Sequence, residues 1–234
     1  MINQRVPVSI IPENDLIRLK KLEQFELSDT NLEPDFDTVA VLAAEIFETS
    51  NARISFIAKD HIFYKSDPWT MERVAREDSL CALSILNEGV TVYEDIYNFG
   101  DLPDSIYLLG EGIRFYAAAP IITIDGFALG TVSVSDREPR SVSTQQTKML
   151  QSLAALVMEK LEDKLAAKIS RNQYCDKLRH LAHDMKNPVT TISLYAQLLS
   201  TREMSTEKVT SMATKIEKSS RILEDNLNKL SCQD

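Results

Sequence analysis

One short string in the last third of the chain carries side chains that could perform a chemical step: His183, Asp184, Asn187 and Pro188. A solvent-exposed imidazole is largely neutral at pH 7, which leaves a ring nitrogen free to attack an electrophile. The carboxylate beside it can orient the ring or accept a proton from the other nitrogen. An amide four residues beyond the histidine reaches the same face of a helix. Taken alone, His183 could equally be an ordinary surface histidine of a helix. The elements around it are therefore needed to decide between the two interpretations.

Two long apolar repeats, the first of which contains the string, predict an antiparallel pair of helices. His183 falls about 200° from Leu181 around the first helix and should point away from its apolar side. We expect Pro188 to distort this helix. One hairpin cannot cover two apolar stripes, so we expect two chains to pair as a four-helix bundle. The steps of four and three residues form two heptad seams: Tyr174, Leu178, Leu181, Met185, Pro188, Ile192, Tyr195, Leu199 and Val209, Ala213, Ile216, Ser220, Leu223, Leu227, Leu230.

The first 140 residues show a different organisation, in which helix and strand patterns are interleaved. Ser79 is a candidate helix cap, and the pair Asp125-Gly126 predicts a tight turn between two strands. These patterns predict an α+β domain with a largely antiparallel sheet. The expected helices are 36–47 and 79–87, and the expected strands are 53–58, 62–65, 90–93, 114–123 and 127–135.

Composition excludes several classes of protein. The net charge of the 234-residue chain is −9, with −11 in residues 1–150 and +2 in 151–234, so we expect no nucleic-acid partner. No apolar run is long enough to span a membrane, and the N-terminus lacks a signal peptide, which favours a cytoplasmic protein. Three cysteines and three histidines predict neither disulfides nor a metal site. All six glycines precede residue 131, so no glycine-rich phosphate loop follows them, and we assign no cofactor.

The string LAHDMKNPVTTI at 181–192 resembles the phosphoacceptor box of sensor histidine kinases, and the hairpin around it, roughly 170–232, resembles their dimerisation and phosphoacceptor domain. The resemblance implies that His183 is the phosphorylated residue, that Asp184 is its acid/base partner and that Asn187 assists dephosphorylation. His180 is a weaker candidate because no acidic residue follows it. His61 lies in a strand pattern beside Asp60 and is interpreted as a surface or edge residue and not as a catalytic one.

The first part of the chain resembles a GAF domain, above all in 32–47, 79–95 and the string GIRFYAAAPIITIDGFALGTVSVSD at 112–136. Such domains use a sheet and its covering loops as a ligand pocket or signal relay, so the resemblance implies a small ligand that the sequence does not identify. Cys81, the one cysteine in this part, is interpreted as a small buried residue. We expect three regions: an N-terminal helical segment (1–31), a GAF-like sensor domain (32–160) and a phosphoacceptor hairpin (161–234).

Together the two resemblances imply a two-component signalling protein, a homodimer in which a GAF sensor is coupled to His183. The expected partners are the receiver domain of a response regulator and a histidine-kinase catalytic domain acting in trans. The family's ATP-binding domain is not seen before Asp234, so we expect no autophosphorylation by this chain, which is either a natural short protein or a piece of a longer kinase. Two alternatives stay open: a dimeric docking protein without chemistry, and a ligand-binding GAF protein without phosphotransfer.

Overall fold

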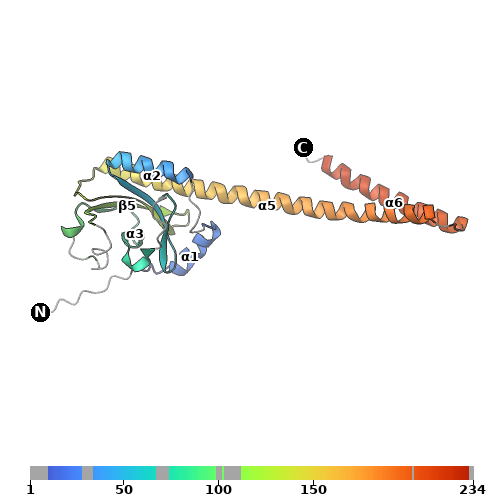
Figure 1. Cartoon of the computed structure of the whole chain (residues 1–234), viewed down its shortest axis with the longest axis horizontal. Coiled ribbons are helices and arrows are strands. Elements are labelled where there is room, and N and C mark those ends of the chain that lie inside the picture. Colours follow the sequence, from blue (N-terminus) through green and yellow to red (C-terminus); the bar gives the residue numbers. More distant parts are fainter. Residues whose placement is uncertain are drawn as a thin grey trace. The chain divides into compact units, whose positions relative to one another are not determined.

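The structure is a computed structural model that describes residues 10–27, 34–66, 74–98, 102, 112–201 and 203–231. The chain divides into two compact units, Met1–Leu165 and Ala166–Asp234. The first unit holds a sheet with helices, and the second holds a helical hairpin (Figure 1). The boundary expected after residue 160 falls inside one continuous helix.

A six-stranded antiparallel sheet forms the centre of the first unit, as the alternating patterns predict. Its strand order is β3-β2-β1-β6-β5-β4, and every neighbouring pair is antiparallel. The strands are β1 (Asn51–Ile57), β2 (His61–Tyr64), β3 (Val74–Ala75), β4 (Thr91–Tyr93), β5 (Phe115–Ile122) and β6 (Ala128–Asp136). Strands β5 and β6 are buried along almost their whole length, because both faces of the sheet are covered.

The hairpin between β5 and β6 confirms the prediction made from Asp125-Gly126. Gly126 has φ 86°, a conformation that glycine adopts without a steric penalty, and its amide donates to the Thr123 carbonyl at 2.8 Å. Further along β6, Gly130 lies opposite Phe56 of β1. A Cβ atom added at Gly130 would lie 2.0 Å from the Ser55 carbonyl oxygen, so close strand packing requires glycine there.

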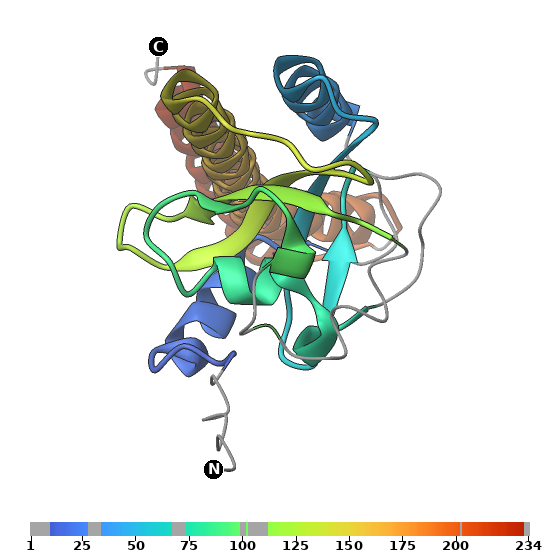
Figure 2. The same ribbon diagram turned by 90° about the vertical axis from the view of Figure 1, so that its left-hand side faces the viewer.

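Helix α2 (Pro34–Phe47) and the beginning of helix α5 (Thr144–Thr201) cover one face of the sheet (Figure 2). The apolar stripe expected at 36–47 points inward, with Phe36, Val39 and Phe47 buried. Val157 of α5 belongs to the same core, as do Val132 and Val134 of β6. Burial of this many large apolar side chains stabilises the first unit, since each contributes about 1.5–3 kcal/mol.

The opposite face is covered by helix α3 (Leu80–Ser84) and by the short 3₁₀ helices η1 (Arg76–Asp78) and η2 (Ile96–Asn98). Ser79 is the N-cap of α3, as predicted, and its Oγ accepts from the Cys81 amide at 3.1 Å. The helix expected at 79–87 is shorter than predicted. Its last turns tighten, because the Leu86 and Asn87 amides bond three residues back instead of four.

Helix α1 (Asp15–Gln24) lies in the expected N-terminal helical segment. Its inward side chains are Arg18 and Leu22, while Leu16 and Ile17 are exposed. The Arg18 Nη1 atom donates to the Ile57 carbonyl at the end of β1, and Lys21 pairs with Asp125 in the β5–β6 turn. A charged side chain therefore faces the protein, a feature that the apolar pattern does not predict.

The second unit consists of the remainder of α5 and of helix α6 (Thr206–Ser231), which runs back beside the end of α5 (Figure 1). Pro188 lies inside α5, and the helix continues through it to Thr201. Contact between the helices is direct, because the Lys215 ammonium lies 5.2 Å from the centre of the Tyr195 ring. Pro188 of α5 and Ser219 of α6 are both buried in this unit.

The side of α6 that is shielded within the chain differs from the predicted seam. Val209 and Leu227 of that seam are exposed, at 40% and 46%. A helix in a four-helix bundle must contact two neighbours, whereas a single chain supplies only one. The shielded positions on α6 are Met212, Ile216, Ser219, Leu223 and Asn226.

Candidate functional site

His183 and Asp184 stand together on the outside of α5. Their side chains are 73% and 67% exposed, and His183 Nδ1 lies 3.4 Å from Asp184 Oδ1. The flanking residues Leu181 and Met185 are partly buried. The helical period that directs those two residues inward directs His183 outward, so its ring is open to an approaching protein.

Asn187 is one turn beyond His183 and is also exposed. Four residues along a helix bring two side chains to the same surface. Among the described residues, no hydrogen bond joins the Asn187 amide to the His183 ring. His183, Asp184 and Asn187 therefore lie on one surface, but only His183 and Asp184 are in contact.

Pro188 removes one backbone donor immediately beside this site. Proline has no amide hydrogen, so the Asp184 carbonyl loses the partner that an ordinary helix would provide. Two hydroxyl groups then bond back into the same region: Thr190 Oγ1 donates to the Lys186 carbonyl at 2.7 Å, and Thr191 Oγ1 donates to the Asn187 carbonyl at 2.9 Å. Such bonds to the preceding turn compete with regular helix geometry. Neither threonine was predicted to have a structural role, although the pattern Pro-x-Thr-Thr is visible in the sequence.

The other two histidines lie elsewhere. His180 is exposed on α5 without an acidic residue after it. His61 is in β2, where its Nδ1 atom lies 2.7 Å from Asp60 Oδ1, and its side chain is 19% exposed. His183 is thus the one described histidine that combines an exposed ring, a neighbouring carboxylate on the same helix and a proline five residues further along it.

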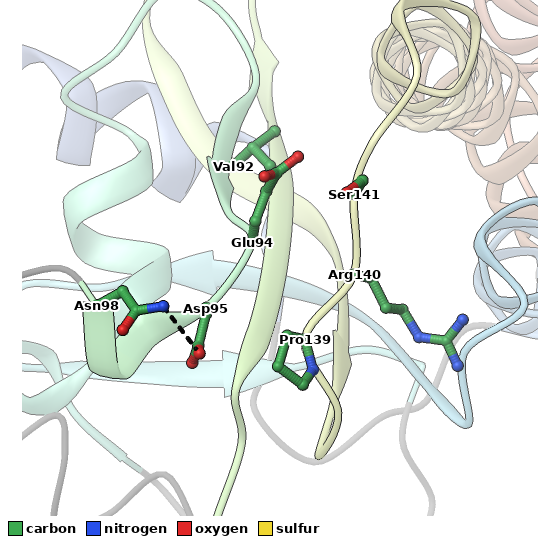
Figure 3. A pocket seen from close by; sticks show the side chains of 7 residues that line it. All are labelled: Val92, Glu94, Asp95, Asn98, Pro139, Arg140 and Ser141. Atoms are coloured by element: carbon green, nitrogen blue, oxygen red, sulfur yellow. Dashed lines mark hydrogen bonds between the residues drawn. The ribbon is translucent and has the colours of Figure 1, made fainter.

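A pocket of about 490 Å³ opens at the edge of the sheet in the first unit (Figure 3). Strand β4 and η2 supply one wall, including Asp95 and Asn98, which are joined by a hydrogen bond of 3.1 Å. The Arg114 guanidinium also pairs with Asp95 and holds the pKa of that carboxyl below its usual value. The lining residues are Val92, Glu94, Asp95, Asn98, Pro139, Arg140 and Ser141.

The pocket adjoins the segment that leads into α5. The Arg140 amide donates to the Glu94 carbonyl at 3.1 Å, and the Val142 amide donates to the Glu94 carboxylate at 3.3 Å. Helix α5 then begins with a capping box, because Ser143 Oγ accepts from the Gln146 amide and Gln146 Oε1 accepts from the Ser143 amide. This start was not predicted, although the spacing Ser-x-x-Gln is a sequence signal for it.

A buried charge cluster holds α1 against η1, and the sequence analysis did not foresee it. Asp15 accepts from Arg18 Nε at 2.7 Å and from both terminal nitrogens of Arg76 at 2.8 and 2.9 Å. Burial alone would raise the pKa of Asp15, but the hydrogen bonds and charges of Arg76 and Arg18 outweigh it and hold this pKa below its usual value. The partners lie 61 residues apart in the chain.

Cys81 is buried, as predicted from the sequence, and it belongs to α3, in the core between this helix and the sheet. The Tyr116 hydroxyl donates to its Sγ atom at 3.4 Å. Burial raises the pKa of Tyr116 well above its ordinary value, so the hydroxyl stays protonated and able to donate.

Two family models match the chain, in the order expected from the sequence. The GAF domain model matches residues 31–161, and the His Kinase A (phospho-acceptor) domain model matches residues 176–231. The chain belongs to the GAF domain family, and it joins this domain to a histidine-kinase phospho-acceptor domain. Both resemblances are confirmed, and the two domains together support a role in two-component signal transduction.

A curated relative, a cyclic di-GMP phosphodiesterase of Pseudomonas aeruginosa, is 32% identical over 153 residues. The match covers 64% of this chain and 26% of the relative, so the chain spans about a quarter of that protein's length. Among solved structures, the GAF domain of an Acinetobacter phosphoenolpyruvate-protein phosphotransferase is 12% identical with a TM-score of 0.48, covering 68% of this chain and 99% of that one. A bacteriophytochrome from R. palustris is 15% identical with a TM-score of 0.48, covering 76% and 43%.

Among the described residues, no helix has the length and apolar content that crossing a membrane requires.

Proposed function

We propose that the protein is a phosphotransfer component of a two-component system, in which a GAF sensor controls a histidine that exchanges phosphate with a response regulator. The observation that carries this proposal is the exposed pair of His183 and Asp184 on α5, with Nδ1 3.4 Å from the carboxylate. The match of this segment to a phospho-acceptor domain supports it.

The chemistry follows from the two nitrogens of one ring. Asp184 faces Nδ1, so Nε2 is the nitrogen left to attack a phosphorus atom. As the N–P bond forms, the P–O bond to the donor breaks, and the donor leaves as the regulator's aspartate carboxylate or as ADP from a kinase domain in trans. The Nδ1 proton then passes to Asp184 or water, which keeps the phosphorylated ring neutral. Phosphoryl transfer depends mainly on alignment of the two groups, and an exposed helix face permits that alignment.

Asn187 and Pro188 are assigned supporting roles. An amide on the same helix face can orient a water molecule toward phosphohistidine, which would promote loss of the phosphate. The proline leaves the Asp184 carbonyl without its normal helix donor, so the backbone there can adjust when a partner docks. Neither residue is needed for the first attack on phosphorus.

A homodimer is part of the proposal. Every residue of α5 from 169 to 180 is exposed within one chain. Most of the stability of a helix in a protein comes from tertiary packing of its apolar side, so this stretch needs a partner. Tyr174 and Leu178 of the heptad seam lie on it, at 64% and 45% exposure. Pairing with the same helix of a second copy would cover both.

Two other functions fit parts of the molecule. The hairpin could serve only as a docking surface, or the GAF domain and its pocket could act without phosphotransfer. The curated relative is a cyclic di-GMP phosphodiesterase that matches 153 residues, which gives the GAF-centred alternative some support. Neither alternative requires an exposed histidine beside a carboxylate, and both predict that phosphate never appears on the chain.

The test is transfer of radioactive phosphate to the chain from receiver domains of the source organism that have been phosphorylated with labelled acetyl phosphate. We expect acid-labile label on the wild-type chain and none on His183→Gln, which removes the nucleophile while keeping a polar side chain of similar size. The matched control is His180→Gln, which should be labelled normally. Equal labelling of the His183→Gln protein, or no labelling by any receiver domain, would refute the proposal.

A further inference from the structure

The pocket beside β4 lies at the outer edge of the sheet and not between the sheet and α3. Strand β4 is the last strand in the sheet order, and the segment 139–141 forms the other wall of the pocket (Figure 3). Val92 of β4 packs against the core on the α2 and α5 side, whereas α3 covers the opposite side. The volume of about 490 Å³ is in the range of small-molecule sites.

One negative charge in the lining lacks a basic partner. The Asp95 carboxylate is paired with the Arg114 guanidinium. The Arg140 guanidinium is paired with Asp136, with Nη2 at 2.7 Å from Oδ2, and it extends away from the other lining residues (Figure 3). In the part of the chain that the structure describes, no basic side chain pairs with Glu94, so the pocket carries an uncompensated carboxylate.

The other polar groups of the lining can accept hydrogen bonds. The Glu94 carboxylate accepts one from the Val142 amide at 3.3 Å through Oε1, which leaves Oε2 for a further donor. The Asn98 Nδ2 atom donates to a neighbouring carboxylate, so the amide oxygen of Asn98 is its remaining acceptor. The Ser141 hydroxyl can also accept. A ligand that matches this lining therefore donates hydrogen bonds and carries a positive charge.

These features favour an organic cation over a metal ion. A divalent metal needs several oxygen ligands, and the described residues contain no group of three or more His, Cys, Asp or Glu that could hold one. Val92 and Pro139 offer apolar contact to a short carbon chain. Residues 1–150 carry a net charge of −11, which attracts cations of any kind to this part of the chain.

We propose that this pocket binds a small organic cation, whose ammonium or guanidinium group pairs with Glu94 while its carbon chain lies against Val92 and Pro139. Binding at this site does not depend on the proposed phosphotransfer. The site adjoins the start of α5, because the Glu94 carbonyl accepts from the Arg140 amide at 3.1 Å and the capping box begins at Ser143. A bound cation therefore holds β4 and the segment that leads into α5 together.

Calorimetric titration of the full-length chain tests the class of ligand. The cations are agmatine, putrescine and methylguanidine, and the neutral control is N-butylurea, which keeps N–H donors and a short carbon chain but has no charge. We expect saturable binding of at least one cation with a dissociation constant of about 1 mM or lower, and binding of N-butylurea that is at least tenfold weaker. Absence of binding for all three cations, or equal binding of N-butylurea, would overturn the proposal.

A pair of charge variants tests the role of Glu94. Glu94→Gln removes the charge but keeps a side-chain oxygen that can accept from the Val142 amide, so the fold should persist. Glu138→Gln removes the same charge from an exposed neighbour that does not line the pocket. We expect Glu94→Gln to weaken binding of the cation at least tenfold and Glu138→Gln to weaken it less than threefold. Equal losses in the two variants would mean that only the general negative charge attracts the ligand.

Hydrogen–deuterium exchange locates the bound cation. The ligand should slow amide exchange in peptides that cover 92–98 and 139–142, and it should leave the peptide that contains Cys81 of α3 unchanged. Protection confined to the Cys81 peptide would place the ligand between α3 and the sheet and would contradict the inference. The proposed phosphotransfer is measured separately, so its failure would leave these binding results unaffected.

Discussion

At the scale of residues, the proposed phosphotransfer divides the work of His183 and its neighbours between attack and release. In this proposal the exposed ring of His183 is the nucleophile; Asp184 faces its Nδ1 atom, and Asn187 lies one turn further along the same helix. Attack needs only the first two groups, whereas hydrolysis of the product needs an oriented water molecule. Substitutions should therefore separate the two steps.

Asn187→Ala should leave phosphate acceptance largely intact and slow its loss by about tenfold, because the amide that orients water is gone. The measurement is the decay of acid-labile label on the purified phosphorylated chain. The control is Gln197→Ala, an exposed amide nearly three turns further along α5. A decay rate equal to that of the wild type would show that Asn187 has no part in dephosphorylation.

Asp15→Asn should destabilise the GAF domain by about 3 kcal/mol at pH 7, because it leaves Arg18 and Arg76 buried without their shared carboxylate. The pKa of Asp15 in the folded protein is lowered from 3.8. The wild type should therefore exceed Asp15→Asn in free energy of unfolding by the full amount above pH 3.8, and this difference should shrink as the pH falls toward the folded-state pKa. Urea unfolding at pH 7 and at the lowest pH that preserves the fold measures this difference.

The matched control for that experiment is Asp125→Asn, which removes a surface partner of Lys21 that is 41% exposed. Exposed ion pairs contribute at most about 1 kcal/mol, so this change should be small. If Asp15→Asn lowered the free energy of unfolding no more than Asp125→Asn does, the buried cluster would not stabilise the domain as proposed.

At the scale of elements, local signals account for most of what could be predicted. The β5–β6 turn follows from Asp125-Gly126 and the start of α3 from Ser79, because both depend on neighbouring residues. Arg18 could not be predicted in the same way. It is buried on α1 while Leu16 is 79% exposed, because it bonds to the Ile57 carbonyl and shares Asp15 with a partner far along the chain.

The arrangement of the candidate site was predictable for a similar reason, because it depends on residues that are close in sequence. His183, Asp184 and Asn187 are close in sequence, and helical periodicity places them on one surface. The shielded side of α6 was not predictable, because two adjacent apolar stripes share Ile216 and Leu223, and the sequence does not say which stripe meets α5 and which meets another chain.

Gly130→Ala should destabilise the sheet by about 3 kcal/mol, since its Cβ would collide with the Ser55 carbonyl across the β1–β6 pair. Gly89→Ala is the control, because no atom lies within 4 Å of a Cβ at that position. Thermal unfolding of the two variants gives the comparison. A Gly130→Ala protein as stable as Gly89→Ala would mean that β1 and β6 do not pack in the observed register.

At the scale of the whole molecule, two GAF domains and two hairpins form the proposed signalling unit. Helix α5 belongs to both domains, beginning at the capping box of Ser143 and Gln146 and carrying His183 near its other end. The segment before α5 is bonded to Glu94 beside the pocket. In the proposed function, a ligand that moves β4 would therefore act on the start of the helix that carries His183.

Leu178→Glu combined with Leu227→Glu should convert the chain to a monomer. Both residues are exposed in one chain, at 45% and 46%, so the hairpin itself should tolerate the change. In the bundle each carboxylate would be buried without a partner, which costs several kcal/mol and weakens the dimer more than a hundredfold. Sedimentation velocity measures this, with Leu194→Glu on the opposite side of α5 as the control.

Direct mapping of the phosphorylated residue tests the central claim. The chain is charged by a labelled receiver domain, digested at alkaline pH to preserve phosphohistidine, and its peptides are sequenced by tandem mass spectrometry. We expect one modified side chain, His183, in the peptide that also contains Asp184. Phosphate found on His180 or His61, or a chain that stays unmodified with every receiver domain of the source organism, would contradict it.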